Sequence, residues 1–182
     1  MQRLYKKYLD EIVPALKEKF GYKNKMAVPS IKKVTLNIGV GHALTDSSYL
    51  ELVENNLQKI SGQKPVKCVA KKSISNFKIR EGMVVGVKVT LRKERMYDFL
   101  DKLINITFPR IRDFRGVDPK IMDGKGNLTI GFKEHISFPE IQSAGLDKLH
   151  GLEISVLTTA KTDKEGFELF KLLGFPFKEK KN

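Results

Sequence analysis

The sequence predicts an α+β fold in which a largely antiparallel sheet has helices packed on one face and an open basic and polar face. Segments with helical periodicity and segments of strict apolar–polar alternation follow one another in the order α-β-α-β-β-α-β-β-α. The outward positions of the alternating segments are mostly polar or basic, which is typical of a sheet face that no helix covers.

The first elements are a helix, a strand and a second helix. Residues 4–20 place apolar side chains at intervals of four, which predicts an amphipathic helix. Residues 31–40 alternate strictly and predict a half-buried strand. Ser48 and Glu51 have the spacing of a capping box, so a second helix is expected to begin there and to end near Gly62.

Residues 65–70 alternate again and predict a strand in which Val66 and Cys68 face inward and Lys67 faces outward. Residues 71–82 lack a clean period and predict a protruding basic loop. The remaining elements are a strand at 84–92, a helix through Tyr97 that Pro109 closes, an irregular connection at 110–127, strands at 128–132 and 154–158, and a helix opened by the Thr162–Glu165 capping box.

Length and composition favour one nucleic-acid-binding domain over residues 1–182. The chain has 182 residues and 41% hydrophobic content, enough for one core. Its 34 Lys and Arg against 21 Asp and Glu give a formal charge of +13, which favours a polyanionic partner. No apolar run suits a membrane span or a secretion signal, and the single cysteine excludes an internal disulfide, so we expect a cytoplasmic protein without a membrane partner.

The predicted open face gathers cations and hydrogen-bonding groups with almost no acid. Its residues are Lys33, Thr35, Asn37, Lys67, Lys88, Thr90, Arg92, Thr129 and Lys133. Because these positions carry no aromatic rings, the sheet differs from one that stacks single-stranded bases. We expect it to recognise the backbone and minor groove of a folded RNA.

A stretch without acidic residues runs from Asn55 to Arg80 and includes Lys59, Lys64 and Lys67. Such a block repels itself unless phosphates neutralise it, although an ordinary solvated lysine-rich surface is the alternative. The candidate RNA-contacting residues of the loop are Lys71, Lys72, Ser73, Ser75, Asn76, Phe77, Lys78 and Arg80. Phe77 fits two roles equally well, stacking on an exposed base or anchoring the loop in the core.

Signals of catalysis are weak. A glycine pattern at 39–41 lacks the third glycine of a dinucleotide site, and Cys68 is expected to be a buried small hydrophobe. No metal or cofactor is expected. The histidines at 42, 135 and 150 lack metal-ligand spacing and are expected at the surface or in turns, and Asp118, Asp123 and Asn127 favour a tight turn over a calcium loop. An RNA-processing enzyme and a regulator that binds DNA or messenger RNA are the competing hypotheses.

The run from Leu57 to Gly82 closely resembles the signature of the fifth large-subunit ribosomal protein, a family that binds 5S rRNA. Three further blocks agree with the bacterial form of this family: 34–41, 112–116 with 132–140, and 173–177. The resemblance covers essentially the whole chain.

This resemblance implies a non-catalytic ribosomal component that is monomeric when free and works in the cytoplasmic ribosome. It implies polar contacts to 5S rRNA at Asn37, Gln63 and Thr90, and attachment of 5S rRNA to 23S rRNA in the central protuberance. The loop from Lys71 to Gly82 is expected to approach peptidyl-site tRNA and 23S rRNA. The segment 110–142 is expected to face a protein of the small-subunit head.

Overall fold

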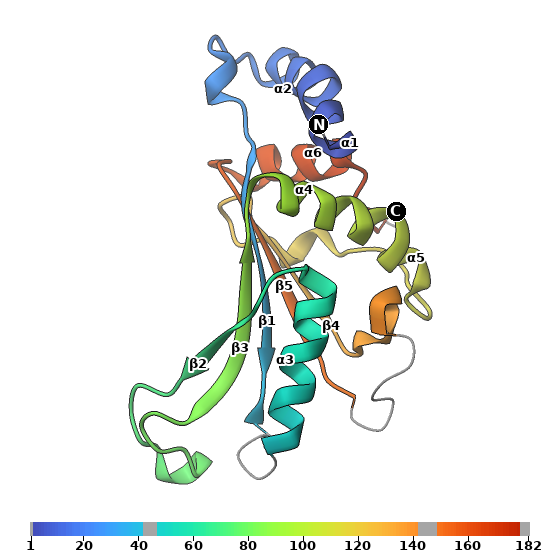
Figure 1. Cartoon of the computed structure of the whole chain (residues 1–182). Helices are drawn as coiled ribbons and strands as arrows, with labels where there is room; N and C mark the ends of the chain where they lie inside the picture. Colours follow the sequence, from blue (N-terminus) through green and yellow to red (C-terminus); the bar gives the residue numbers. More distant parts are fainter. Residues whose placement is uncertain (1, 42–46, 142–148, 179–182) are drawn as a thin grey trace. The chain divides into compact units, whose positions relative to one another are not determined.

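The computed structural model describes residues 2–41, 47–141 and 149–178 and has the predicted α+β architecture (Figure 1). Five strands form one sheet in the order β2-β3-β1-β5-β4. The strands are β1 (Ile31–Gly39), β2 (Val66–Val69), β3 (Val84–Leu91), β4 (Leu128–Phe132) and β5 (Leu152–Thr158). The α-helices are α1 (Arg3–Lys7), α2 (Val13–Phe20), α3 (Ser47–Ser61), α4 (Lys93–Lys102), α5 (Phe108–Arg110) and α6 (Asp163–Leu173). The predicted element order is confirmed.

The chain divides into two compact units. Unit 1 comprises residues 1–34, 91–130 and 155–182, and unit 2 comprises residues 35–90 and 131–154. The boundaries between the units fall inside β1, β3, β4 and β5. That residues 1–182 act as one domain stays a prediction.

The long strands follow the alternation that the sequence predicts. In unit 2, Leu36 and Ile38 of β1 and Val87 and Val89 of β3 are at most 2% exposed, whereas the residues between them are exposed or half-buried. Helix α3 contributes Val53, Leu57 and Ile60 to the buried side chains of this unit. One face of the sheet in unit 2 is therefore apolar and the other is polar.

The predicted orientation of β2 is wrong. Val66 pairs with Lys88 and Lys67 with Val87, and directly opposite residues of an antiparallel pair point to the same face. Because Val87 is buried, Lys67 lies on the apolar side, where its Nζ is 3.2 Å from Glu54 Oε2 of α3. Val66 is 60% exposed. A strand of four residues at the sheet edge carries too short a pattern to specify its register, and a shift of one residue exchanges the two faces.

Two of the predicted helices in unit 1 contain a proline, and each helix continues past its proline. A π-helical turn at Tyr8–Ile12 precedes Pro14, and another at Leu103–Thr107 precedes Pro109. In each case the residue before the proline donates its N–H to the carbonyl five residues earlier. The wider turn accommodates a residue that lacks an N–H. Pro109 therefore does not close its helix, which ends at Arg110.

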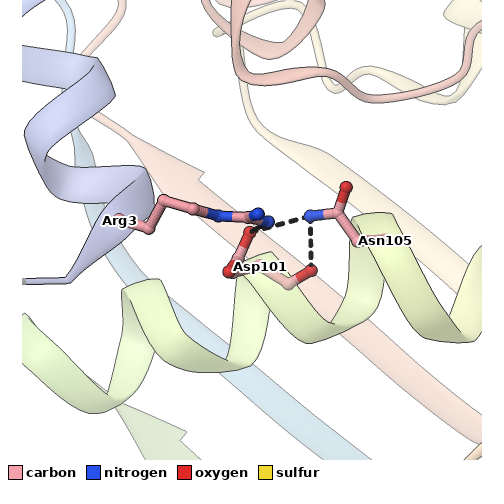
Figure 2. Close-up of polar contacts among 3 residues, drawn as sticks. All are labelled: Arg3, Asp101 and Asn105. Carbon is pink, nitrogen blue, oxygen red and sulfur yellow. Dashed lines mark hydrogen bonds and ion pairs between the residues drawn. The ribbon is translucent and has the colours of Figure 1, made fainter.

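A polar network joins α1 to α4 in unit 1, as Figure 2 shows. Arg3 Nη2 lies 2.7 Å from Asp101 Oδ1, and Asn105 Nδ2 donates to the same oxygen at 2.7 Å. Asn105 also donates to the Asp101 carbonyl at 3.0 Å. Asp101 thus holds the N-terminal helix against α4.

The irregular connection of unit 1 contains the predicted tight turn. Asp123 Oδ1 accepts from the N–H groups of Lys125 and Asn127, and Asn127 Nδ2 donates to Asp123 Oδ2 at 2.7 Å. The hydrogen bond from Asn127 is the main cause that lowers the pKa of Asp123. Within the described ranges no group of His, Cys, Asp or Glu residues could hold a metal ion.

Candidate nucleic-acid interface

The polar side of the sheet in unit 2 forms a surface that we call the polar face, defined by Thr35, Asn37, Lys88, Thr90 and Glu153. Lys88 and Asn37 are exposed, and the two threonines are half-buried. A Cβ atom built on Gly86 would lie 3.9 Å from Asn37 Oδ1 and 3.8 Å from Cys68 Cβ, so these positions share one face of β1, β2 and β3. Lys88 follows Gly86 by two residues and lies on the same face.

Sequence reasoning missed Glu153 as a member of this surface. Its neighbours Leu152 and Ile154 are buried, whereas Glu153 is exposed on β5 and its Oε2 accepts a hydrogen bond from Asn37 Nδ2 at 3.2 Å. The alternation that placed Ile154 inward also places Glu153 outward, so the signal was present in the sequence.

Gln63 and Lys64 follow the end of α3. Gly62 takes a positive φ of 66°, and its N–H bonds to the carbonyl of Gln58. Ser61 Oγ donates to the Leu57 carbonyl at 2.7 Å and accepts from the Gln63 N–H at 3.2 Å. These bonds fix the backbone at Gln63, whose side chain is half-buried, while Lys64 is exposed.

The predicted loop at 71–82 is the tip of a hairpin between β2 and β3, which we call the basic hairpin (residues 70–83; Figure 1). Reciprocal backbone hydrogen bonds join Ile74 and Ile79 at 2.8 and 3.2 Å. Between them, a 3-10 turn at Ser75–Phe77 leads to Lys78 in the left-handed conformation, with φ 54°. The tip therefore has a defined backbone conformation.

The side chains of the basic hairpin point mostly into solvent. Phe77 is 67% exposed, which contradicts the role of core anchor and leaves base stacking as its open role. The exposed polar residues are Lys71, Lys72, Ser73, Ser75, Asn76, Lys78, Arg80 and one acid, Glu81. Among the described residues, no ion pair involves the cations of this set.

Four candidates from the predicted open face do not belong to the polar face of unit 2. Lys67 lies on the apolar side with Glu54. Lys33, Arg92 and Thr129 belong to unit 1, and Arg92 is the N-cap residue of α4 rather than a strand residue. We therefore build the interface from unit 2 alone.

The two described histidines do not lie at the surface, although His135 begins a 3-10 turn, and the predicted inward position of the cysteine is wrong. The rings of His135 and His150 stack in unit 2 with centroids 4.0 Å apart, and each residue is at most 4% exposed. Burial lowers the pKa of His150 to about 4, with a smaller contribution from His135, and burial also lowers the pKa of His135. Asn56 Nδ2 lies 3.2 Å from His150 Nε2. Cys68 is half-buried on the polar side, and His42 lies outside the described residues.

Comparison with known proteins identifies relatives over nearly the whole chain. One family model, described as ribosomal protein L5, matches residues 24–80, and a second, described as the C-terminus of the same ribosomal protein family, matches residues 84–177. The large ribosomal subunit protein uL5 of Caldanaerobacter subterraneus is 59% identical over 97% of this chain and 99% of the relative. The protein of the same name from Halothermothrix orenii is 55% identical over 98% of this chain and 100% of the relative.

Proposed function

Because the chain belongs to the ribosomal protein L5 family, we propose that it binds 5S rRNA through the polar face of unit 2 and helps to attach this RNA to 23S rRNA. The chain is a ribosomal protein of the large subunit in the cytoplasmic ribosome, and it is not an enzyme. None of the helices in the described part of the chain has the length and apolar character that crossing a bilayer requires.

The composition of the polar face carries this proposal. Exposed Lys88 can neutralise a phosphate, and Asn37 and Thr90 offer hydrogen-bonding groups. None of the residues that define the polar face is aromatic. The minor groove of A-form RNA is wide and shallow and displays hydroxyl groups and base edges, so the polar face of a sheet can approach it closely. Phosphate contacts supply most of the affinity in such a complex, and the polar side chains set its register.

The basic hairpin supports a second contact. It extends beyond the sheet with exposed cations and an exposed Phe77 at its tip. The backbone hydrogen bonds between Ile74 and Ile79 restrict its conformation, which lowers the entropy lost when it binds. We assign it to peptidyl-site tRNA and neighbouring 23S rRNA, with Phe77 stacking on a base.

The connection after α5 is our candidate for a bridge to a small-subunit head protein. In unit 1, the Val117 N–H donates to the Pro176 carbonyl at 2.7 Å, and the Lys178 N–H donates to the Val117 carbonyl at 2.9 Å. These bonds hold the segment, while Arg112 and Arg115 stay exposed beside it. Such a held segment with exposed side chains suits a contact with another protein. Gln142, at the end of the expected bridge segment, lies outside the described residues.

Substitutions on the polar face test the 5S rRNA assignment. Asn37→Ala and Thr90→Ala should each weaken binding to 5S rRNA by about 1 to 3 kcal/mol, because each removes a hydrogen-bonding partner that the complex desolvates. Gln58→Ala, on the exposed side of α3, is the matched control and should change binding by less than about 0.5 kcal/mol. Equal binding by all three variants and the unsubstituted protein would remove the polar face from the interface.

A further inference from the structure

A carboxylate stands on a surface whose other charge is positive. Exposed Glu153 on β5 and exposed Lys88 on β3 flank Asn37 on the central strand β1. Among the described residues of the polar face, Glu153 is the one acid. Two strand spacings separate the backbones that carry the opposite charges, which is about 10 Å. A ligand that crosses β1 therefore meets a cation on one side and an acceptor on the other.

Asn37 and Glu153 orient each other. Asn37 Nδ2 donates to Glu153 Oε2 at 3.2 Å, so the amide oxygen points toward Gly86 of β3. An ionised carboxylate accepts at about four positions, and Asn37 occupies one of them. Glu153 therefore keeps acceptor capacity for a donor on the ligand.

Two strand positions near this pair are glycines, which carry no side chain. A Cβ atom built on Gly39, two residues beyond Asn37 on β1, would meet no atom within 4 Å. Gly86 has no side chain of its own beside the Asn37 amide oxygen, and it is buried next to Cys68. Asn37 and Glu153 are themselves exposed, so a ribose–phosphate backbone can reach their polar atoms.

Resting on the proposed function, we infer that Glu153 determines the preference for RNA over DNA by accepting a hydrogen bond from a ribose 2′-hydroxyl. A carboxylate repels phosphate and accepts hydrogen bonds but donates none when ionised. The donors that A-form RNA displays in its minor groove include the 2′-hydroxyl, which DNA lacks. Lys88 binds the phosphate, and Glu153 reads the sugar on the other side of Asn37.

The test measures the affinity of the full chain for bacterial 5S rRNA transcripts that carry 2′-deoxynucleotides at one of the four nucleotide types. For the unsubstituted protein, at least one such transcript should bind about tenfold more weakly than unmodified 5S rRNA, because a hydrogen bond to a charged acceptor is lost. For Glu153→Ala, the ratio of the affinity for unmodified 5S rRNA to the affinity for that transcript should fall below about threefold. Glu51→Ala removes the same charge from an exposed position on α3 and should keep the ratio of the unsubstituted protein.

A purely electrostatic role of Glu153 would strengthen binding to every transcript alike and leave the ratio unchanged, which would overturn the inference. Transcripts with inosine in place of guanosine test the other minor-groove donor. If Glu153→Ala reduces the effect of inosine on binding and not the effect of the 2′-deoxynucleotides, the inference is also overturned. If Glu153→Ala loses its fold by circular dichroism, Glu153→Met, which has a similar length and no oxygen acceptor, replaces it. If the unsubstituted protein does not prefer 5S rRNA over an unrelated structured RNA, the proposed function fails, and the inference fails with it.

Discussion

Substitution of one lysine on each side of the sheet gives the sharpest test of the interface. Lys67 and Lys88 are near neighbours on β2 and β3, yet they lie on opposite sides because Lys67 pairs with Val87. We predict that Lys88→Gln weakens binding to 5S rRNA and that Lys67→Gln leaves it almost unchanged. Both substitutions remove one positive charge, so each controls for the other.

The expected magnitudes differ clearly. One lost phosphate contact lowers the slope of log K against log salt concentration by about 0.7 to 0.9, and this is the change expected for Lys88→Gln. Lys67→Gln should change the slope by less than about 0.3. Its main effect is the loss of the ion pair with Glu54, in which the two charged atoms are 3.2 Å apart. The side chain of Lys67 is 46% exposed and that of Glu54 is 20% exposed. A pair this exposed contributes at most about 1 kcal/mol, or about 2 to 4 °C in Tm.

Fluorescence anisotropy with labelled 5S rRNA between about 50 and 300 mM salt measures both slopes, and thermal unfolding measures the cost of the lost ion pair. An equal fall in slope for the two variants would refute the reasoning. It would mean that Lys67 reaches phosphate and that the side assigned to it from the β2–β3 register is incorrect.

Three further predictions concern the hairpin, the buried histidines and the close approach of two glycines. Phe77→Ala should leave the Tm within about 2 °C, because the ring is exposed, and should weaken tRNA binding in reconstituted subunits; unchanged tRNA binding would exclude stacking. Since the folded pKa of His150 is about 4 and the ordinary value is 6.5, protonation favours the unfolded state. Stability should be full above pH 7 and fall by about 1.4 kcal/mol at pH 5.5 in urea titrations, and His150→Phe should fall less than this. Gly166→Ala would place a Cβ atom 2.6 Å from Gly126 and should destabilise unit 1 by about 2 kcal/mol or more, whereas Gly131→Ala meets open space and should be tolerated in the same thermal assay.

The long alternating strands could be predicted from the sequence because a strand of seven or more residues repeats its pattern several times. Thus Leu36, Ile38, Val87 and Val89 are buried as predicted. The capping box at the last helix is also confirmed, since Thr162 Oγ1 accepts from the Glu165 N–H at 3.4 Å. Local hydrogen-bonding signals of this kind do not depend on distant parts of the chain.

The predictions that failed depend on contacts between distant residues. The orientation of Lys67 follows from pairing with β3, which four residues of local pattern cannot specify. The burial of His135 and His150 follows from their mutual stacking across a separation of 15 residues, and the sequence contains no signal for it. Glu153 was missed although its alternation was readable, because its bond to Asn37 joins strands 116 residues apart.

Selective binding to 5S rRNA is the most direct test of the proposed function. The purified chain should be titrated with 5S rRNA, an unrelated structured RNA and duplex DNA across a series of salt concentrations. Our account predicts that preference for 5S rRNA persists near physiological salt, because the polar contacts of the polar face are not screened as phosphate contacts are. Equal affinities that fall together for all three nucleic acids as salt rises would contradict it and would show that the +13 charge alone drives binding.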